Sequence, residues 1–196
     1  MAESSLAHGV ASSIIFICGG VRSGKSSFAE KIAAEDAAKI NGQLHYLAAG
    51  RNSDAEMTER IARHQKDREQ SGLAWKTWEQ PVDLIALTGV FSKKDVVLLD
   101  CLTTLLNNEF FSVDEQWQNV DFQKKVMKSI LAGIEQISAQ CYQLIIVSNE
   151  VLHEAQGDNE LVFIYGKILG QLHQQVVAKA HHAYLVEAGI PLLMKG

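Results

Sequence analysis

Short apolar runs alternate with longer amphipathic stretches along most of the chain. The runs are rich in Val, Ile and Leu, which is typical of strands buried on both faces of a sheet. Five of them are predicted to be strands: residues 14–18, 44–49, 96–99, 144–147 and 183–186. Because strands that alternate with helices form parallel sheets, the pattern predicts an α/β fold with a mostly parallel sheet flanked by helices in three layers.

Apolar residues spaced three and four apart predict helices between these strands. One helix is expected over residues 27–35, directly after the first strand, and two longer ones over residues 122–137 and about 162–180. A fourth stretch, residues 55–68, also has helical spacing but is polar and charged. The fourth helix is therefore expected to be exposed, whereas the other three bury an apolar stripe.

Length and composition are those of a single globular domain. A chain of 196 residues, 47% of them apolar, is long enough to bury one sizeable core. We expect a loose tail over residues 1–13 and one domain over residues 14–196. Only Pro81 and Pro191 interrupt the chain, and neither lies where it would divide two domains. No apolar run approaches the roughly 20 residues that a membrane span requires.

Charge and cysteine content narrow the class of partner and the compartment. The net charge of −5 comes with no basic block, so the sequence gives no indication of nucleic acid or an anionic membrane as a partner. Cys18, Cys101 and Cys141 are odd in number, widely spaced, and each next to an apolar run. These features are typical of reduced core thiols and predict a cytoplasmic protein.

The segment between the first predicted strand and the first predicted helix is rich in glycine. It fits the pattern G-x-x-x-x-G-K-[ST] and consists of Gly19, Gly20, Val21, Arg22, Ser23, Gly24, Lys25 and Ser26. In such a loop the backbone N–H groups surround phosphate oxygens, the lysine contacts the terminal phosphates, and the serine hydroxyl holds Mg²⁺. We therefore predict a nucleotide site with Lys25 as a catalytic residue and Ser26 as a metal ligand. The alternative, a chance match on a glycine-rich turn, is disfavoured by the strand and helix on either side.

Asp100 follows the apolar run 96–99 directly. In phosphate-loop proteins a carboxylate at the end of a strand lies near the loop serine and orders Mg²⁺ directly or through water. Alone, an aspartate here is more typical of a helix cap or turn, but next to the loop it is predicted to be the second metal-side residue. The acceptor of the chemistry stays open, because kinases, nucleotide triphosphatases and nucleotide-gated binding proteins share these two elements.

His64 lies in the charged stretch 55–68, among the cations Arg60, Arg63, Lys66 and Arg68. Charged helices are most often solvated surfaces, and a surface histidine is the plainer interpretation. The flanking cations would, however, favour a bound triphosphate and would favour the neutral, nucleophilic imidazole. A neutral imidazole can attack the α-phosphorus of a nucleotide, expel pyrophosphate and keep the nucleotidyl group.

Several further motifs occur in a fixed order along the chain. Besides the loop they are Tyr46-Leu47-Ala48-Ala49, Glu56-Met57 with Arg60-Ile61 and His64, Trp75-Lys76-Thr77-Trp78-Glu79, Leu99-Asp100-Cys101-Leu102-Thr103-Thr104, Asn108, Val147-Ser148-Asn149-Glu150 and Ala188-Gly189-Ile190-Pro191-Leu192. This set resembles the bifunctional adenosylcobinamide kinase/adenosylcobinamide-phosphate guanylyltransferase family of cobalamin biosynthesis. The resemblance covers most of the chain from Ile14 to Lys195.

The resemblance implies two activities with GTP, ATP and Mg²⁺ as cofactors. The first phosphorylates the corrinoid adenosylcobinamide with ATP or GTP, and the second transfers GMP from GTP to adenosylcobinamide phosphate. It also implies that His64 carries the guanylyl group as a phosphoramidate, that Glu79 and Asp100 contact nucleotide or metal, and that the protein is a homotrimer. Further nucleotide contacts are expected from Ala49, Gly50, Arg51, Gln65, Lys66, Asp67 and Arg68.

The chain departs from the family pattern after Asn149-Glu150. The family usually has a Gly/Pro-containing turn and then an Arg-Asp pair near the start of the next helix, where this chain has residues 151–157 and later Gly166-Lys167. His173 stands where the family tends to have Asn. These changes leave the phosphate loop and His64 unaltered.

Two other functions are compatible with the loop and Asp100. One is a kinase of another small alcohol, in which His64 is a surface residue. The other is a nucleotide-dependent interaction module that turns over no corrinoid. Trp75, Trp78 and Trp117 either line a corrinoid surface or pack in the core, and the core is the more typical place for aromatic residues beside apolar runs.

Overall fold

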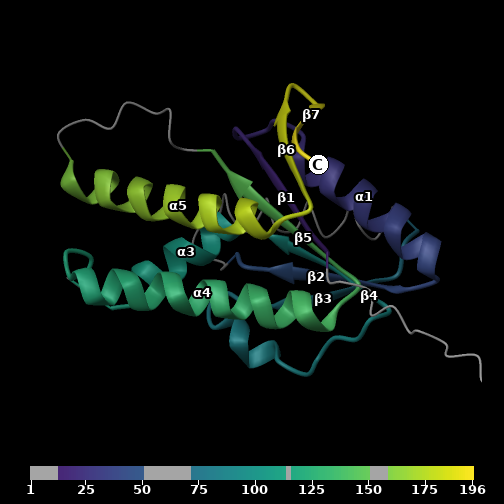
Figure 1. The fold of residues 1–196 in the computed structure, drawn as a ribbon, viewed down its shortest axis with the longest axis horizontal. Helices are drawn as coiled ribbons and strands as arrows, with labels where there is room; N and C mark the ends of the chain where they lie inside the picture. The colour runs from purple at the N-terminus through teal and green to yellow at the C-terminus, as the bar shows by residue number, and fades with distance from the viewer. Residues whose placement is uncertain (1–12, 51–71, 114–115, 151–158) are drawn as a thin grey trace, which may run out of the picture.

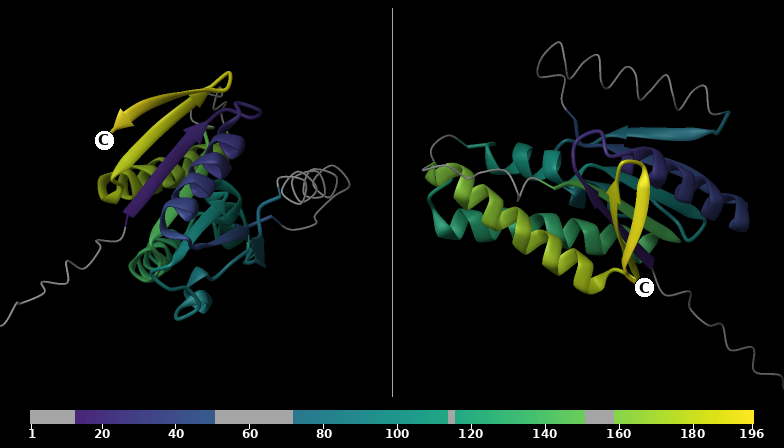
Figure 2. Two further views of the ribbon diagram at one scale, coloured as in Figure 1. Left: turned by 90° about the vertical axis from the view of Figure 1, so that its right-hand side faces the viewer. Right: turned by 90° about the horizontal axis from the view of Figure 1, so that it is seen from above.

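In the described part of the chain, a seven-stranded sheet lies between helix α1 (Lys25–Ile40) on one face and helices α3 (Leu102–Phe110), α4 (Val120–Gln140) and α5 (Glu160–Lys179) on the other (Figure 1, Figure 2). The structure is a computed structural model and describes residues 13–50, 72–113, 116–150 and 159–196. The expected tail over residues 1–13 lies outside the described residues apart from Ser13, which begins the first strand, and the charged stretch 55–68 lies outside them entirely. None of the helices in the described part is long and apolar enough to cross a bilayer.

The strands follow one another in the sheet in the order β3-β2-β4-β5-β1-β6-β7. All paired neighbours are parallel except β6 and β7, which form an antiparallel hairpin at one edge. Their bounds are β1 Ser13–Gly19, β2 Gln43–Ala48, β3 Trp75–Glu79, β4 Asp95–Asp100, β5 Gln143–Asn149, β6 His182–Glu187 and β7 Ile190–Lys195.

Four α-helices and a short 3-10 helix cover the sheet in the described part of the chain. Their bounds are α1 Lys25–Ile40, η1 Leu84–Leu87, α3 Leu102–Phe110, α4 Val120–Gln140 and α5 Glu160–Lys179. Asn119 and Asn159 begin the two longest helices, and the side chain of each accepts backbone N–H groups of the first turn. Asparagine caps of this kind satisfy donors that have no partner within the helix.

The five strands predicted from apolar runs are confirmed as β1, β2, β4, β5 and β6, with bounds that differ by one or two residues. The helices predicted over residues 27–35, 122–137 and about 162–180 are confirmed as α1, α4 and α5. The sequence pattern missed β3, β7 and α3. Both missed strands are edge strands. Strand β3 contains the polar residues Lys76 and Thr77, and the apolar run of β7 contains Pro191, which is disfavoured within strands.

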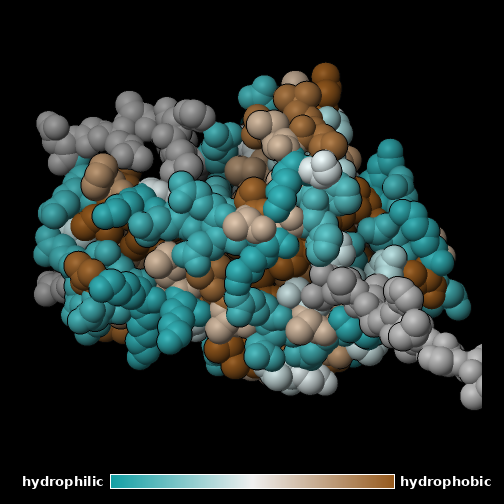
Figure 3. Space-filling model, in the orientation of Figure 1, coloured by the Kyte–Doolittle hydropathy of each residue, from teal (hydrophilic) through white to brown (hydrophobic). Residues whose placement is uncertain are grey.

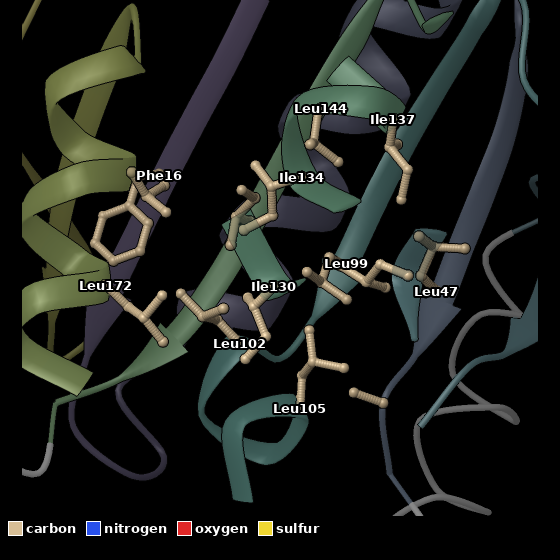
Figure 4. Packing of buried hydrophobic residues seen from close by; sticks show 14 of the residues in the cluster. Phe16, Leu47, Leu99, Leu102, Leu105, Ile130, Ile134, Ile137, Leu144 and Leu172 are labelled. Carbon is tan, nitrogen blue, oxygen red and sulfur yellow. The ribbon is translucent and has the colours of Figure 1, made fainter. Parts of the chain in front are cut away.

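The core has two parts, one on each face of the sheet. Figure 4 shows the larger part, in which α3, α4 and α5 pack on the sheet through residues such as Phe16, Leu99, Leu102, Ile130, Ile134 and Leu172. On the other face, α1 packs through Ala29, Ala33 and Ala37, which are four residues apart and buried. Because alanine side chains are short, they let the axis of α1 lie close to the sheet and hold the start of this helix at the end of β1.

Apolar side chains are also exposed on the edge hairpin. Ile190, Leu193 and Met194 of β7 are each more than half exposed, and Figure 3 shows apolar surface over this hairpin at the top of the view. The three tryptophans pack against the core: Trp75 on the α1 face, and Trp78 and Trp117 on the opposite face. The core interpretation of these aromatic residues is thereby supported.

Candidate nucleotide-binding and catalytic site

The predicted phosphate loop joins the carboxyl end of β1 to the first turn of α1. Gly24, with φ of 90°, precedes the helix, and no side chain caps the first N–H groups of α1. The first turn also contains no acidic residue. An uncapped helix start carries partial positive charge and N–H donors with no partner in the helix, which is the arrangement that binds phosphate.

The turn between β6 and β7 lies directly against the phosphate loop. The Gly189 N–H donates to the Ser23 carbonyl over 2.8 Å, and a Cβ on Gly24 would lie 3.1 Å from the Gly189 Cα. At the start of the loop, a Cβ on Gly19 would clash with the carbonyl of Val186 in β6. Glycine is thus required at positions 19 and 24 by close approach of backbone, and at position 24 also by the positive φ.

Lys25, the first residue of α1, is buried, with 4% of its surface exposed. Its Nζ donates to the carbonyl oxygen of Gly20 over 3.0 Å. The Ser23 hydroxyl, also in the loop, is buried and has no hydrogen-bond partner among the described residues. A buried ammonium and a buried hydroxyl beside free helix N–H groups form a site that suits a polyanion.

Asp100 ends β4, which is separated from the phosphate-loop strand by β5. With neighbouring strands about 4.8 Å apart, β4 and β1 are about 10 Å apart. The Asp100 carboxylate accepts a hydrogen bond from the Tyr46 hydroxyl over 3.0 Å. Because side chains of a strand alternate between its two faces, the Asp100 side chain lies on the same face of the sheet as Leu98, which packs on the α1 side. Ser26 lies in the first turn of α1. Both residues offer oxygen atoms, the ligands that Mg²⁺ prefers.

The ends of β5 and α3 add polar residues whose role the sequence did not predict. The backbone N–H of Asn149 donates to the Thr103 hydroxyl over 2.8 Å. That hydroxyl lies 2.9 Å from the Ser148 hydroxyl, which in turn lies 2.8 Å from Nε2 of His173 in α5. Thr103, Ser148 and Asn149 belong to motifs of the family resemblance, but nothing in their spacing indicates this hydrogen-bonded chain.

The remaining predicted contacts lie further along the carboxyl edge of the sheet. Ala49 and Gly50 follow β2, and Asn108 of α3 fixes this segment by donating to the carbonyls of Ala49 and Pro81 over 2.8 and 3.0 Å. Glu79 ends the edge strand β3 and is exposed. It lies four strands from β1, a separation of about 19 Å, so the structure does not bring Glu79 to the phosphate loop.

The predicted nucleophile His64 lies outside the described residues, as do Arg51, Gln65, Lys66, Asp67 and Arg68. The described chain ends at Gly50 after β2 and resumes at Gly72 before β3. No group of three or more His, Cys, Asp or Glu side chains in the described part is arranged to hold a metal ion.

The cysteines are unpaired thiols, as predicted. Burial raises the pKa of Cys18 to about 11, although Lys25 lowers it. Burial and the charge of Asp100 raise the pKa of Cys101 as well. Thiols with raised pKa values are poor nucleophiles at neutral pH, so neither cysteine near the loop is a candidate for covalent catalysis.

A phosphate loop at the carboxyl edge of a parallel sheet, with a buried lysine and a strand-end aspartate, defines a P-loop nucleotide-binding protein. The family model CobU, described as cobinamide kinase / cobinamide phosphate guanyltransferase, matches residues 15–194. The chain belongs to this family.

Curated relatives agree with this assignment. The chain is 30% identical over 188 residues to the bifunctional adenosylcobalamin biosynthesis protein CobU of Escherichia coli strain K12, covering 93% of this chain and 99% of the relative. It is 32% identical over 181 residues to the bifunctional adenosylcobalamin biosynthesis protein CobP of Pseudomonas aeruginosa, covering 92% of this chain and 96% of the relative. Among solved structures, flagellar accessory protein FlaH from Methanocaldococcus jannaschii superposes with a TM-score of 0.51 at 17% identity, covering 94% of this chain and 79% of that chain. This last likeness shows the fold alone.

Proposed function

We propose that the chain phosphorylates adenosylcobinamide with ATP or GTP and then transfers GMP from GTP to the product, giving adenosylcobinamide-GDP. The observation that carries the proposal is the phosphate loop with its buried Lys25 and uncapped helix start, in a chain that belongs to the cobinamide kinase / cobinamide phosphate guanyltransferase family.

In the kinase step, the loop N–H groups bind the β- and γ-phosphates. Lys25, which donates to the Gly20 carbonyl in this structure, turns its ammonium to the phosphates and balances charge on the transferring group. Ser26 and Asp100 are the residues that would hold Mg²⁺, and the bound ion would neutralise charge on the phosphates. The acceptor oxygen forms a bond to the γ-phosphorus as the bond from that phosphorus to the bridging oxygen breaks.

In the transfer step, neutral His64 attacks the α-phosphorus of GTP and pyrophosphate leaves. The phosphate of adenosylcobinamide phosphate then attacks the phosphoramidate, and the imidazole leaves. Two sequential displacements let one side chain serve first as nucleophile and then as leaving group. Arg51, Gln65, Lys66, Asp67 and Arg68 surround His64 in sequence, and we assign them, with Ala49, Gly50 and Glu79, to binding of the nucleotide.

The family resemblance also leads us to propose a homotrimer in the cytoplasm. The exposed apolar residues of β7 support subunit contacts, because isolated subunits rarely expose contiguous apolar surface. The three unpaired cysteines support a reducing compartment. Light scattering on the purified protein measures the assembly directly, and a monomer would contradict the trimer.

The test is a pulse and chase with GTP labelled at the α-phosphate. We expect label on the protein that is stable in alkali, labile in acid and absent from His64→Ala. Chasing with adenosylcobinamide phosphate should move the label to adenosylcobinamide-GDP. In parallel, ATP labelled at the γ-phosphate should label adenosylcobinamide.

The outcomes separate the alternatives. Labelled adenosylcobinamide without any labelled protein would leave a plain kinase. Nucleotide binding without either product would leave an interaction module. Retention of protein label in His64→Ala would place the covalent bond on another residue.

A further inference from the structure

Two buried polar atoms at the carboxyl edge of the sheet have no hydrogen-bond partner in the described part of the chain. They are the Ser23 hydroxyl oxygen, within the phosphate loop, and the Asn149 side-chain oxygen Oδ1, at the end of β5. An unpaired buried polar atom costs free energy, and a ligand that supplies the missing partner removes that cost. Ser23 belongs to the loop already described, whereas Asn149 has no assigned role.

Asn149 lies beside the start of the phosphate loop. It is the register partner of Gly19 in the parallel pair of β5 and β1, and the next backbone N–H, that of Glu150, donates to the Gly19 carbonyl over 3.0 Å. Asn149 is two residues after Val147, which belongs to the core on the α1 face. Because side chains alternate along a strand, the Asn149 side chain lies on the face that also carries Lys25 and Asp100.

The opposite face supplies a buried support for this residue. The Asn149 N–H donates to the Thr103 hydroxyl. That hydroxyl is hydrogen-bonded to the Ser148 hydroxyl, which is in turn hydrogen-bonded to His173. Ser148 is fully buried. We call the hydroxyls of Thr103 and Ser148 with the His173 imidazole the relay. Since a backbone N–H can only donate, the Thr103 oxygen accepts, and its proton is available to the next member of the relay.

His173 is suited to be the fixed end of the relay. Its ring packs edge-on against Phe16, with ring centroids 5.1 Å apart. Burial lowers the pKa of His173 to about 4, so the imidazole is neutral at physiological pH. In the neutral tautomer that carries its proton on Nδ1, Nε2 accepts the Ser148 proton, and all the hydrogen bonds from Asn149 to His173 then run in one direction, in which each bond polarises the next.

We propose that the Asn149 side-chain oxygen accepts a hydrogen bond from the hydroxyl that attacks the γ-phosphate. Ser148 and His173 are positioning residues that act on Asn149 through Thr103. The inference rests on the proposed kinase step and adds the residue that orients its acceptor. A hydroxyl is a suitable partner, because an amide oxygen accepts a hydrogen bond from an O–H, whereas it would repel a phosphate oxygen.

The chemistry of the step balances without a proton moving to Asn149. The acceptor oxygen forms its bond to the γ-phosphorus, ADP leaves with the electron pair of the broken bond, and the hydroxyl proton passes to an oxygen of the transferred phosphoryl group. The amide holds the O–H along the line of attack, which is the kind of orientation that raises kcat without changing the affinity for nucleotide.

The first test compares Asn149→Ala with wild type in the phosphorylation of adenosylcobinamide by ATP. We expect kcat to fall about a hundredfold, with less than a twofold change in the Kd of a non-hydrolysable ATP analogue. The matched control is Asn107→Ala, an exposed asparagine on α3. If the Kd rises as much as kcat falls, Asn149 is a nucleotide ligand, and if kcat is unchanged it has no role; either result overturns the proposal.

The second test asks whether His173 acts through Asn149. His173→Leu should lower kcat about tenfold, and His173→Gln, which places an amide nitrogen or oxygen near the position of Nε2, should restore most of it. The double variant Asn149→Ala/His173→Leu should be no slower than Asn149→Ala alone, because the two residues act in series. If the reductions in kcat of the two single variants multiply in the double variant, or if His173→Gln does not restore kcat, His173 is a purely structural residue and the relay is refuted.

A third measurement keeps this inference separate from the proposed function. In the absence of corrinoid, water replaces the alcohol as the acceptor, and ATP is hydrolysed slowly. The rate of this hydrolysis should be lower in Asn149→Ala than in wild type, by a factor similar to that for phosphorylation of adenosylcobinamide. If wild type hydrolyses ATP but never phosphorylates adenosylcobinamide, the proposed function fails while the Asn149 result still stands. If wild type phosphorylates adenosylcobinamide and Asn149→Ala matches it in both reactions, only the inference fails.

Discussion

The two ends of the parallel sheet differ in how far their buried polar groups are paired within the protein. Towards the amino end, Asp95 accepts hydrogen bonds from the N–H and hydroxyl of Ser92 over 2.6 and 3.0 Å and lies 3.3 Å from Nε2 of His45. Nδ1 of His45 in turn accepts from Trp78 over 3.0 Å, whereas Nε2 has no hydrogen-bond partner in the described residues and faces the Asp95 carboxylate. At the carboxyl end, Ser23 and Asn149 each retain a buried oxygen with no partner in the described residues.

The difference shows which polar groups serve the fold and which serve a ligand. A buried group that is paired within the protein contributes to stability, and one without a partner costs stability until a ligand binds. In open parallel sheets, ligands bind beyond the carboxyl ends of the strands. We therefore expect substitutions at the carboxyl end to change turnover and those at the amino end to change the free energy of unfolding.

The largest effect is expected at Lys25. Lys25→Ala should lower the kinase kcat by about 10² to 10³, because the ammonium stabilises charge on the transferring phosphoryl group. The midpoint of urea unfolding should change little in comparison. Lys39→Ala, in the last turn of the same helix, is the control and should retain full activity. Equal activity in the two variants would remove the loop from the mechanism.

Acid should destabilise the protein through His173. Burial lowers its pKa in the folded protein to about 4, from the value of 6.5 that an exposed histidine has in the unfolded chain. As pH falls from 6.5 to 4 the unfolded chain gains a proton that the folded protein does not, so stability is complete above pH 6.5 and falls by about 3 kcal/mol towards pH 4. Urea unfolding at several pH values should show a shallower decline in His173→Gln. An identical decline in both proteins would mean that His173 is accessible to water.

Asp95 tests the amino end. Asp95→Ala leaves the Ser92 donors and the His45 ring without their acceptor, and we expect a loss of about 2 kcal/mol in the free energy of unfolding. The kcat of the folded protein should equal that of wild type. Asp121→Ala, whose side chain is 95% exposed on α4, controls for the loss of one carboxylate. A large fall in kcat without a change in stability would reverse the contrast between the two ends.

The smallest effect is expected in the turn that contacts the phosphate loop. Ala188, with φ of 48°, and Gly189, with φ of 80°, form the two-residue connection of β6 and β7. Both positions of such a turn favour Asn-Gly, so Ala188→Asn should stabilise the protein by about 0.5 to 1 kcal/mol. Thermal unfolding checks this gain, and activity should be unchanged. A lower melting temperature would show that the turn tolerates only a small side chain.

Much of this architecture could be predicted from the sequence, because strands buried on both faces and amphipathic helices leave distinct patterns. The β1–loop–α1 unit was predicted for the same reason, since its residues are contiguous. Strand β3 could not be predicted in this way, because it is an edge strand in which the exposed residues Lys76 and Thr77 interrupt the apolar run. Helix α3 is only nine residues long, too short for its spacing to stand out.

The site was predictable only where its residues are adjacent in the chain. Ser148 and His173 are 25 residues apart and Thr103 and Ser148 are 45 apart. The contacts between these residues arise from the placement of α3 and α5 on one face of the sheet, which no local pattern encodes. His173 therefore gave no sequence signal of its connection to Asn149.

The most direct measurement is a crystal structure of the protein with Mg²⁺ and a non-hydrolysable GTP analogue. We predict the β- and γ-phosphates on the N–H groups of the loop, the Lys25 ammonium moved from the Gly20 carbonyl to a phosphate oxygen, and the Asn149 amide facing the γ-phosphate. A nucleotide bound elsewhere, with Lys25 still donating to Gly20, would contradict the assignment of the carboxyl edge as the nucleotide site.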